Sequence, residues 1–219
     1  MGTKEKIVVK ALEMFNERGI EYVGLRELAA VLGMRVSNIT YYFPTKDDLV
    51  YAIAQELSRS NAAVIVERDR LTMRSFLEMM HQVFQNHVTF RCLLLSVVHL
   101  MAQNKYMAAA YQQTQNVRNA TMRANLEILR ASGYLTIQEE GELSFLVSAL
   151  SLISRFWISE AAVSFREMST EEQIDHYLTL VTNLLRPYCS SKAKKEMQEF
   201  LSDLQSKVLS HQEGAGKQG

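Results

Sequence analysis

Apolar residues recur at helical spacing along almost the whole chain of 219 residues. Over residues 3–18, Ile7, Ala11 and Phe15 fall on one face of a helix, and Gly19 is well suited to end it. The same spacing predicts helices over about 46–68, from 72 onward, and over about 90–103, 105–131, 139–165, 170–188 and 192–210. No sustained alternation of apolar and polar residues indicates a strand. We therefore expect an all-α protein of about nine or ten helices.

Capping residues mark several of these helix ends. Thr45 is suited to cap the helix that follows, and Asp47 and Asp48 would lie in its first turn, where carboxylates are favourable. Gly133 can adopt the left-handed conformation of a helix end after the long helix. Two later helix starts have the spacing of a capping box, Thr136 to Glu139 and Thr170 to Gln173.

The stretch from Gly24 to Lys46 combines a short apolar helix, Gly33, a second short helix and then a proline. This order is typical of a helix-turn-helix motif, in which the second helix enters the major groove of DNA. Between Leu28 and Lys46 there is no Asp or Glu, whereas Arg35 and Lys46 carry positive charge. Because DNA phosphates repel carboxylates, this local composition favours a DNA-binding role.

Further anchors extend this motif toward the amino terminus, and the whole set is Ile7, Ala11, Leu12, Phe15, Asn16, Glu17, Arg18, Gly19, Leu28, Ala29, Gly33, Tyr41, Phe43 and Lys46. In this register, residues 7–46 resemble the amino-terminal domain of the tetracycline-repressor (TetR) family of dimeric bacterial transcription regulators. The resemblance implies a two-part helical homodimer that binds a roughly palindromic operator and acts mainly as a repressor released by a small molecule. Gly24, Arg35 and Thr40 depart from the family pattern, which usually has Thr or Ser, Ser, and Tyr at these positions.

The candidate DNA contacts are Arg26, Arg35, Val36, Ser37, Asn38, Thr40, Tyr41, Tyr42 and Lys46. Arg35 and Asn38 open the second helix, where Arg can bind guanine and Asn can bind adenine, each contact being worth roughly 1–3 kcal/mol of discrimination. Arg26 and Lys46 lie at neighbouring helix starts and suit phosphate contacts. The alternative is an ordinary solvated helix end with core tyrosines, although the resemblance favours Tyr41 as a phosphate contact.

The helix predicted over 139–165 is apolar on more than one side. One stripe contains Phe145, Ala149, Leu152 and Phe156, and another contains Leu146, Leu150, Ile153 and Trp157. A helix that is apolar nearly all round must be covered on both sides. We interpret this helix and the next one as a dimer interface, as the resemblance also implies. The candidate interface residues are Leu146, Leu150, Ile153, Trp157, Leu178, Val181 and Leu185.

Methionines and aromatic residues are frequent between Met73 and Met122. Such a lining suits a cavity for an apolar or amphipathic effector, although core packing explains the same residues without a ligand. Arg155, or alternatively Arg91, could anchor an anionic ligand group, and a salt bridge at the dimer interface is the other interpretation of Arg155. The candidate ligand-binding residues are Met80, Phe84, Met101, Tyr111, Met122, Arg155 and Phe156.

Composition narrows the remaining classes of function. The hydrophobic content of 47% supports a real core, and the formal net charge is zero, so only the local distribution of charge indicates a nucleic-acid partner. Cys92 and Cys189 suggest neither a disulfide framework nor a metal site, and the histidines have no ligand spacing. The absence of a disulfide framework fits a reducing cytoplasm, and the uncharged runs are too short to span a bilayer, so we expect a soluble cytoplasmic protein.

We expect a DNA-binding domain over residues 1–46, an effector-binding and dimerisation domain over 47–211, and a disordered tail over 212–219. The last helix, over 192–210, should pack on the body or on the partner. A competing interpretation is a dimeric small-molecule-binding protein that does not bind an operator. An enzyme is a third possibility, but the sequence contains no catalytic or cofactor motif, and we predict no cofactor and no metal.

Overall fold

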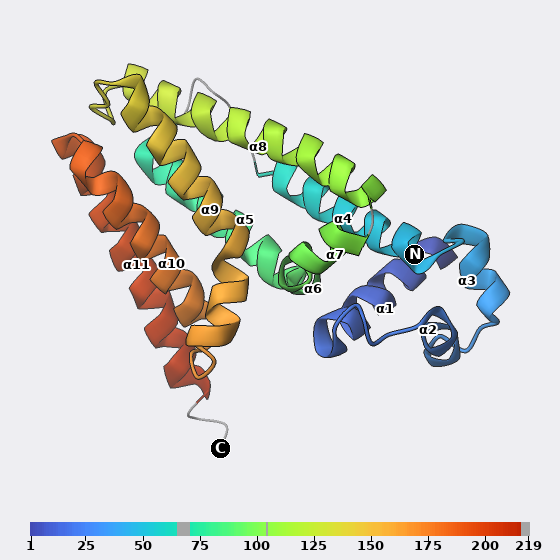
Figure 1. The fold of residues 1–219 in the computed structure, drawn as a ribbon. Helices are drawn as coiled ribbons and strands as arrows, with labels where there is room; N and C mark the ends of the chain where they lie inside the picture. Colours follow the sequence, from blue (N-terminus) through green and yellow to red (C-terminus); the bar gives the residue numbers. More distant parts are fainter. Residues whose placement is uncertain (65–70, 104, 216–219) are drawn as a thin grey trace. The chain divides into compact units, whose positions relative to one another are not determined.

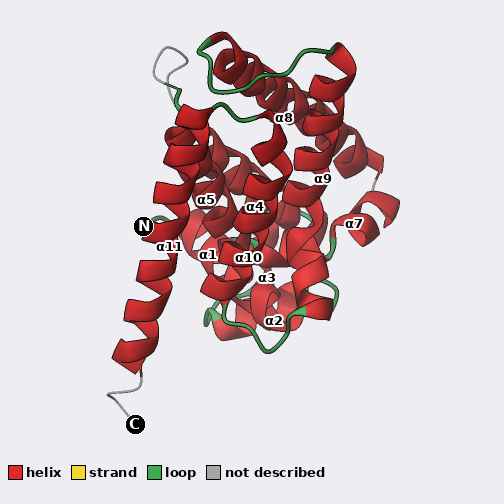
Figure 2. Cartoon of the chain, turned by 90° about the vertical axis from the view of Figure 1, so that its left-hand side faces the viewer, coloured by secondary structure: helices red, strands yellow, loops and turns green. Residues whose placement is uncertain are grey.

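The computed structural model describes residues 1–64, 71–103 and 105–215 (Figure 1). The helices are α1 (Thr3–Arg18), α2 (Leu25–Val31), α3 (Val36–Tyr42), α4 (Lys46–Ala62), α5 (Met73–Thr89), α6 (Arg91–Leu95), α7 (Val97–Gln103), α8 (Lys105–Ala131), α9 (Glu140–Ser164), α10 (Thr170–Leu185) and α11 (Ser191–Ala215), with a 3-10 turn η2 (Arg186–Tyr188). Figure 2 shows helices and loops and no strand in this part of the chain, where an isolated bridge joins Leu135 to Cys189. The all-α expectation is confirmed.

One compact unit comprises Met1–Ala63 and Asn86–Tyr111. Within it α1 contacts α2, α3, α4 and α6, and its apolar face, which includes the fully buried Ile7, supports the shorter helices. Helices as short as α2 and α3 are not stable alone in water. They are therefore held by buried anchors, Leu28 on α2 and Ile39 on α3.

The other unit comprises Val64–Gln85 and Gln112–Gly219, and its described part includes most of α5 and α8 and all of α9, α10 and α11. In its core the ring of Phe84 stacks on that of Trp157 with 4.9 Å between centroids, and the ring of Tyr177 lies 5.5 Å from that of Trp157. α10 contacts both α9 and α11. Large aromatic side chains thus join α5, α9 and α10 into one core.

The last helix, α11, packs on the body of the same chain. The backbone N–H of Arg74 donates to Glu196 Oε2 at 3.0 Å, and Arg74 Nη2 donates to Asp203 Oδ2 at 2.6 Å. The hydroxyl of Tyr134 donates to the other oxygen of Glu196 at 3.1 Å. The buried apolar residues of α11 are Ala193, Met197, Phe200 and Leu204. Of the two packing sites considered for this helix, the structure favours the body.

The stretch predicted as one helix over 90–103 forms two helices, α6 and α7. Ser96 separates them, because its φ of −95° and ψ of 6° lie outside α-helical geometry. The start of α6 is fixed by Asn16, whose Nδ2 donates to the carbonyl of Thr89 at 2.8 Å and whose Oδ1 accepts from the N–H of Cys92 at 3.0 Å. Periodicity does not reveal a contact between residues 73 positions apart.

The two predicted glycine ends are confirmed, since Gly19 is the C-cap of α1 and Gly133 after α8 has a φ of +72°, whereas the predicted amino-terminal caps match at one site and differ at two. Thr45 caps α4 as predicted, accepting from the N–H of Asp48 at 3.2 Å. Glu139 rather than Thr136 caps α9, and Ser169 rather than the following threonine caps α10. The hydroxyl of Thr136 donates instead to a carbonyl of η2 at 3.0 Å. Thr136 thus joins the loop before α9 to η2, and the helix begins only at Glu140.

Two helix ends differ from their predicted bounds. α4 ends at Ala62, and the last part of the helix predicted to about 68 lies outside the described residues. α11 continues to Ala215, so the first part of the predicted disordered tail is helical, and residues 216–219 lie outside the described residues. The predicted bounds of α1 and α8 are confirmed.

Candidate nucleic-acid interface

The turn between α2 and α3 is set by Gly33, which has a φ of +63°. The N–H of Gly33 donates to the carbonyl of Ala30 at 3.1 Å, and the N–H of Met34 donates to the carbonyl of Ala29 at 3.0 Å. These two bonds satisfy carbonyls at the end of α2, in the pattern that a left-handed glycine makes possible. The chain therefore leaves α2 sharply and starts α3 within a few residues.

Of the two faces of α3, one is anchored and the other exposed. Ile39 is fully buried, whereas Ser37, Asn38 and Tyr41 are exposed, the last by 80%. In Figure 1, α3 lies at the edge of its own unit. A polar, exposed helix face on a buried anchor is the arrangement that can approach base edges.

The remaining candidate base contacts lie beside this face. Arg35 is exposed and is the N-cap of α3, not its first helical residue, and its side chain makes no capping hydrogen bond. Val36 and Thr40 are half-buried, and the Thr40 hydroxyl donates to the Ser37 carbonyl at 3.4 Å. Tyr42 is 38% exposed, and its ring lies edge-on to that of Tyr41 at 5.0 Å. Tyr41 and Tyr42 are the last two residues of α3, so candidate contacts are present at both ends of this helix.

The candidate phosphate contacts come from the helices on either side. Arg26 is exposed at the start of α2. Lys46 is half-buried at the start of α4, where its Nζ donates to the carbonyl of Glu21 at 3.3 Å. Glu27, the carboxylate of α2, forms an ion pair with Arg18. This pairing reduces the negative charge next to the candidate interface.

Lys4 was not among the predicted contacts, yet the structure brings it to the same region. Its Nζ lies 5.7 Å from the centroid of the Phe43 ring, which follows α3 directly. Attraction between an ammonium and an aromatic ring holds the cation there. The sequence signal for it was only the polar face of an amphipathic helix, which many solvated lysines share.

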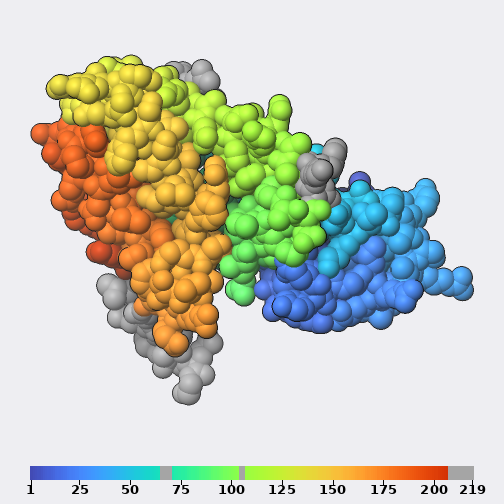
Figure 3. Space-filling view, viewed as in Figure 1, coloured from blue at the N-terminus to red at the C-terminus, as the bar shows by residue number. Residues whose placement is uncertain are grey.

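Most of the predicted dimer-interface residues are covered by their own chain. Leu146, Leu150, Trp157, Leu178, Val181 and Leu185 are all buried within the single chain, and Ile153 is half-buried. The other stripe of α9 is the outer one, since Phe145 is 53% and Leu152 is 59% exposed. The space-filling view shows α9 at the surface along its length (Figure 3). The stripe taken as the interface is therefore core, and the exposed apolar surface lies on the opposite side of the helix.

The candidate ligand residues fall into both units. Met101 and Tyr111 belong to the first unit, and the others belong to the second. Met80 and Phe84 are buried, and the stacking of Phe84 on Trp157 gives that ring a role in the core. Arg91, the alternative anchor, is exposed in the first unit.

Arg155 is half-buried in the second unit, and its Nη2 donates to Gln115 Oε1 at 2.8 Å. The aromatic ring nearest its guanidinium is that of Phe156, 5.9 Å away. No ion pair of Arg155 is present in the described part of the chain. The salt-bridge interpretation of this residue is thus not supported within one chain.

Other chemistry finds little support in the residues that are described. No three His, Cys, Asp or Glu side chains among them gather as metal ligands would. Burial raises the pKa of Cys92 to about 12 and that of Cys189 to about 11, which keeps both thiols protonated and poorly nucleophilic. α9 is long and apolar enough to span a membrane by composition, but core helices pass the same test.

Family models match most of the chain. The model described as bacterial regulatory proteins of the tetR family covers residues 7–53, and the TetR model described as bacterial transcriptional repressor covers residues 56–197. The chain is 42% identical over 52 residues to the HTH-type transcriptional dual regulator CecR of Shigella flexneri, which is 24% of this chain and 23% of CecR. Matches to the curated relatives span about a quarter of their length.

Solved structures share the fold over nearly the whole chain. A TetR-family transcriptional regulator from Marinobacter aquaeolei VT8 superposes with a TM-score of 0.84 at 21% identity, covering 93% of this chain and 99% of that one. The SmeT–triclosan complex superposes with a TM-score of 0.65 at 16% identity, covering 88% and 94% of the two chains. From the two family models together, which extend from residue 7 to residue 197, we conclude that the chain belongs to the TetR family of bacterial transcriptional regulators.

Proposed function

We propose that the chain acts as a homodimeric transcriptional repressor, which binds a roughly palindromic operator through α3 and is released by a small-molecule effector. The observation that carries this proposal is the two-faced α3. Ile39 fixes its inner face, and Asn38 and Tyr41 extend from its outer face with Arg35 beside them. Base contacts would come from Arg35 to Asn38, and phosphate contacts from Arg26, Thr40 to Tyr42, and Lys46.

The dimer would form through the exposed apolar face of α9 and α10. Phe145, Leu152 and Val163 are exposed on one side of α9, and Leu180 is exposed on α10. Large apolar side chains exposed together are typical of surfaces through which soluble proteins associate. Two recognition helices would then lie about one DNA turn apart, ~34–36 Å.

Effector release would follow from binding linkage. A molecule that binds better to the state that does not fit the operator weakens operator binding by that difference in affinity. SmeT, which shares this fold, forms a complex with triclosan, and this supports an effector that is a small molecule. On this proposal residues 1–46 contact DNA and residues 47–211 bind the effector and the partner subunit.

The test is selection of DNA from a random pool, followed by fluorescence anisotropy with the selected fragment in a salt series. We expect saturable binding. The logarithm of the association constant should fall linearly with the logarithm of the salt concentration. The Arg35→Ala/Asn38→Ala double variant should lose preference for the selected sequence. Arg130→Ala, on the exposed surface of α8, is the matched control and should leave it unchanged.

The competing function is a dimeric small-molecule-binding protein without an operator. It predicts that no sequence is enriched from the pool and that the double variant behaves like the control. Either result would remove the DNA-binding proposal, whereas ligand binding could still be measured by calorimetry.

A further inference from the structure

Six side chains in the described part of the chain have a buried atom without a hydrogen-bond partner, and four of them lie on α8 and α9. These four atoms are Nε2 of Gln115, Oδ1 of Asn119, Oγ of Ser154 and Nε of Arg155. A buried donor or acceptor without a partner is costly, and native proteins contain few of them. Gln115 and Arg155 are hydrogen-bonded to each other, so their two unpartnered donors lie close together and call for a ligand that would satisfy both.

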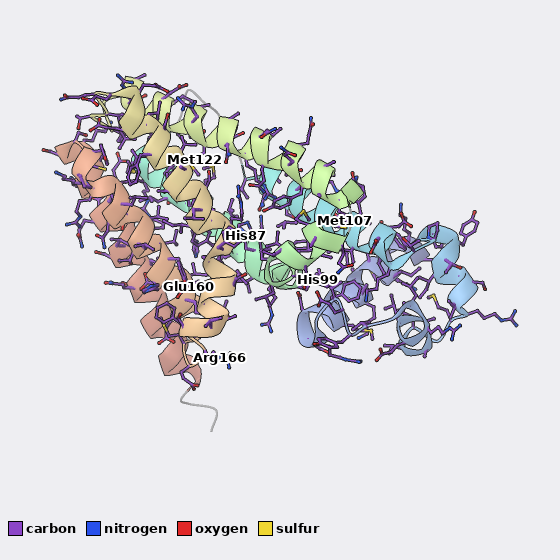
Figure 4. All side chains as sticks on the ribbon, in the orientation of Figure 1. His87, His99, Met107, Met122, Glu160 and Arg166 are labelled. Carbon is purple, nitrogen blue, oxygen red and sulfur yellow. The ribbon has the colours of Figure 1, made fainter. Side chains whose placement is uncertain are left out.

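Two of these side chains, Gln115 and Arg155, come together across the two helices. Arg155 Nη2 donates to Gln115 Oε1 at 2.8 Å, which fixes the guanidinium of α9 against the amide of α8. The N–H groups on Gln115 Nε2 and Arg155 Nε remain as donors on this pair. Asn119 follows Gln115 by one helical turn and lies on the same face of α8. Figure 4 locates the region through Met122, which lies three residues further along the helix.

A second arginine between the same two helices provides an internal comparison. Arg123 of α8 forms an ion pair with Glu140 of α9, and its Nη2 donates to Ser144 Oγ at 2.9 Å. Arg155 has an amide as its partner and no carboxylate among the described residues. The charge of Arg123 is thus neutralised by the chain itself, and that of Arg155 is not.

We propose that Gln115 and Arg155, with Asn119 one helical turn away, bind the carboxylate end of the effector through the two donors Nε2 and Nε, so that the effector is an organic acid. This inference rests on the proposed function, in which the second unit binds an effector. A carboxylate accepts hydrogen bonds and donates none, so one oxygen can accept from Arg155 Nε while the other accepts from Gln115 Nε2. Its negative charge also neutralises the guanidinium. Asn119 accepts from a hydroxyl or N–H of the ligand, or donates after a half-turn of its amide.

The experiment compares ligands that differ only in the charged end. Octanoate, 1-octanol and octylammonium form one set, and 3-phenylpropionate, 3-phenylpropanol and 3-phenylpropylammonium form another. Binding to the full-length protein is measured by isothermal calorimetry, with thermal unfolding as a second readout. We expect at least one carboxylate to bind saturably and about tenfold or more tightly than its alcohol, with no binding of the ammonium ion.

Variants then assign that preference to the site. Arg155→Met should abolish the difference between carboxylate and alcohol, and Arg155→Lys, which keeps the charge but lacks the Nε donor, should retain part of it. Gln115→Leu should weaken binding of the carboxylate and leave binding of the alcohol unchanged. Arg130→Met, which removes an exposed arginine from α8, should bind as the unchanged protein does.

Three outcomes would overturn the proposal: equal binding of acid and alcohol, no saturable binding of either acid at millimolar concentration, or an unchanged preference in folded Arg155→Met. These readouts need no DNA. Failure of the site is thus distinguishable from failure of operator binding, which the anisotropy experiment measures separately.

Discussion

Both α3 and α9 turn one face toward their own unit and the other toward solvent, but the two outer faces differ in chemistry. The outer face of α3 carries Ser37, Asn38 and Tyr41, and an arginine caps its start. The outer face of α9 carries Phe145 and Leu152 at more than half exposure. One helix exposes hydrogen-bonding groups, and the other exposes hydrocarbon.

This difference indicates two kinds of partner. Polar donors and acceptors without nearby carboxylates suit the edges of bases and the phosphates of DNA. Exposed apolar area gains roughly 25 cal/mol per Å² when it is buried, so the outer face of α9 favours a second apolar surface. A second copy of the same face is the simplest such surface, since a two-fold interface is self-complementary.

The largest expected effects come from matched glutamate substitutions two residues apart on α9. Leu152→Glu places a charge on the outer face and should split the dimer without unfolding the subunit, lowering operator affinity by about 10²-fold or more. Leu150→Glu buries a charge in the core and should destabilise the fold by about 4 kcal/mol or more. Light scattering, denaturant unfolding and anisotropy measure the three quantities.

The two substitutions also serve as controls for each other. A dimeric Leu152→Glu protein with unchanged operator affinity would place the interface elsewhere. A folded but monomeric Leu150→Glu protein would restore the original assignment of Leu150 and Trp157 to the interface. Both results can be obtained from the same preparations.

The contrast between these helices also explains how far the sequence could predict the structure. The motif around Gly33 was recognisable because its glycine, apolar anchors and missing acids are local features. The two stripes of α9 were equally visible, but the sequence did not show which one the chain itself covers. That choice depends on α5 and α10, which supply Phe84 and Tyr177 around Trp157.

Other differences have the same physical origin. Ser169 forms the capping box of α10 with Glu172, and the threonine after it has the same spacing to Gln173, so the sequence offered two overlapping boxes. Asn16 joins α1 to the junction of α5 and α6 through bonds that no local pattern encodes. In the candidate ligand region, the hydrogen bond between Arg155 and Gln115 joins residues 40 positions apart.

The next effect concerns the polar face of α3. Arg35→Ala and Asn38→Ala should each relax the preference for one base position by roughly 1–3 kcal/mol while leaving the dimer intact. Competition anisotropy with operators that carry single base changes measures this loss. If either variant weakened all operators equally and kept its base preference, α3 would not be the helix that reads the sequence.

A smaller effect tests the turn that positions α3. Gly33→Ala should destabilise the protein by roughly 1–2 kcal/mol, because its φ of +63° disfavours any residue with a Cβ, although no heavy atom lies within 4 Å of the added carbon. Gly141→Ala, in the first turn of α9 and equally uncrowded, should instead stabilise slightly, by up to roughly 0.5 kcal/mol. Denaturant unfolding measures the change in the free energy of unfolding for both variants. If the two changes had the same sign, the backbone conformation of Gly33 would not explain the effect.

The smallest expected effect separates phosphate contacts from base contacts. Lys46→Ala should lower the slope of log affinity against log salt by about one unit and weaken all operators alike, because one fewer phosphate is neutralised. Lys46 also donates to the Glu21 carbonyl at 3.3 Å, so the variant must first be shown to unfold at the same denaturant concentration. Lys195→Ala, on α11, removes a lysine that pairs with Glu199 and should leave the slope unchanged. A change of base preference in Lys46→Ala would show that this side chain contacts a base and not a phosphate. An equal loss of slope in Lys195→Ala would show that the salt dependence arises from the overall charge of the protein and not from a contact at the start of α4.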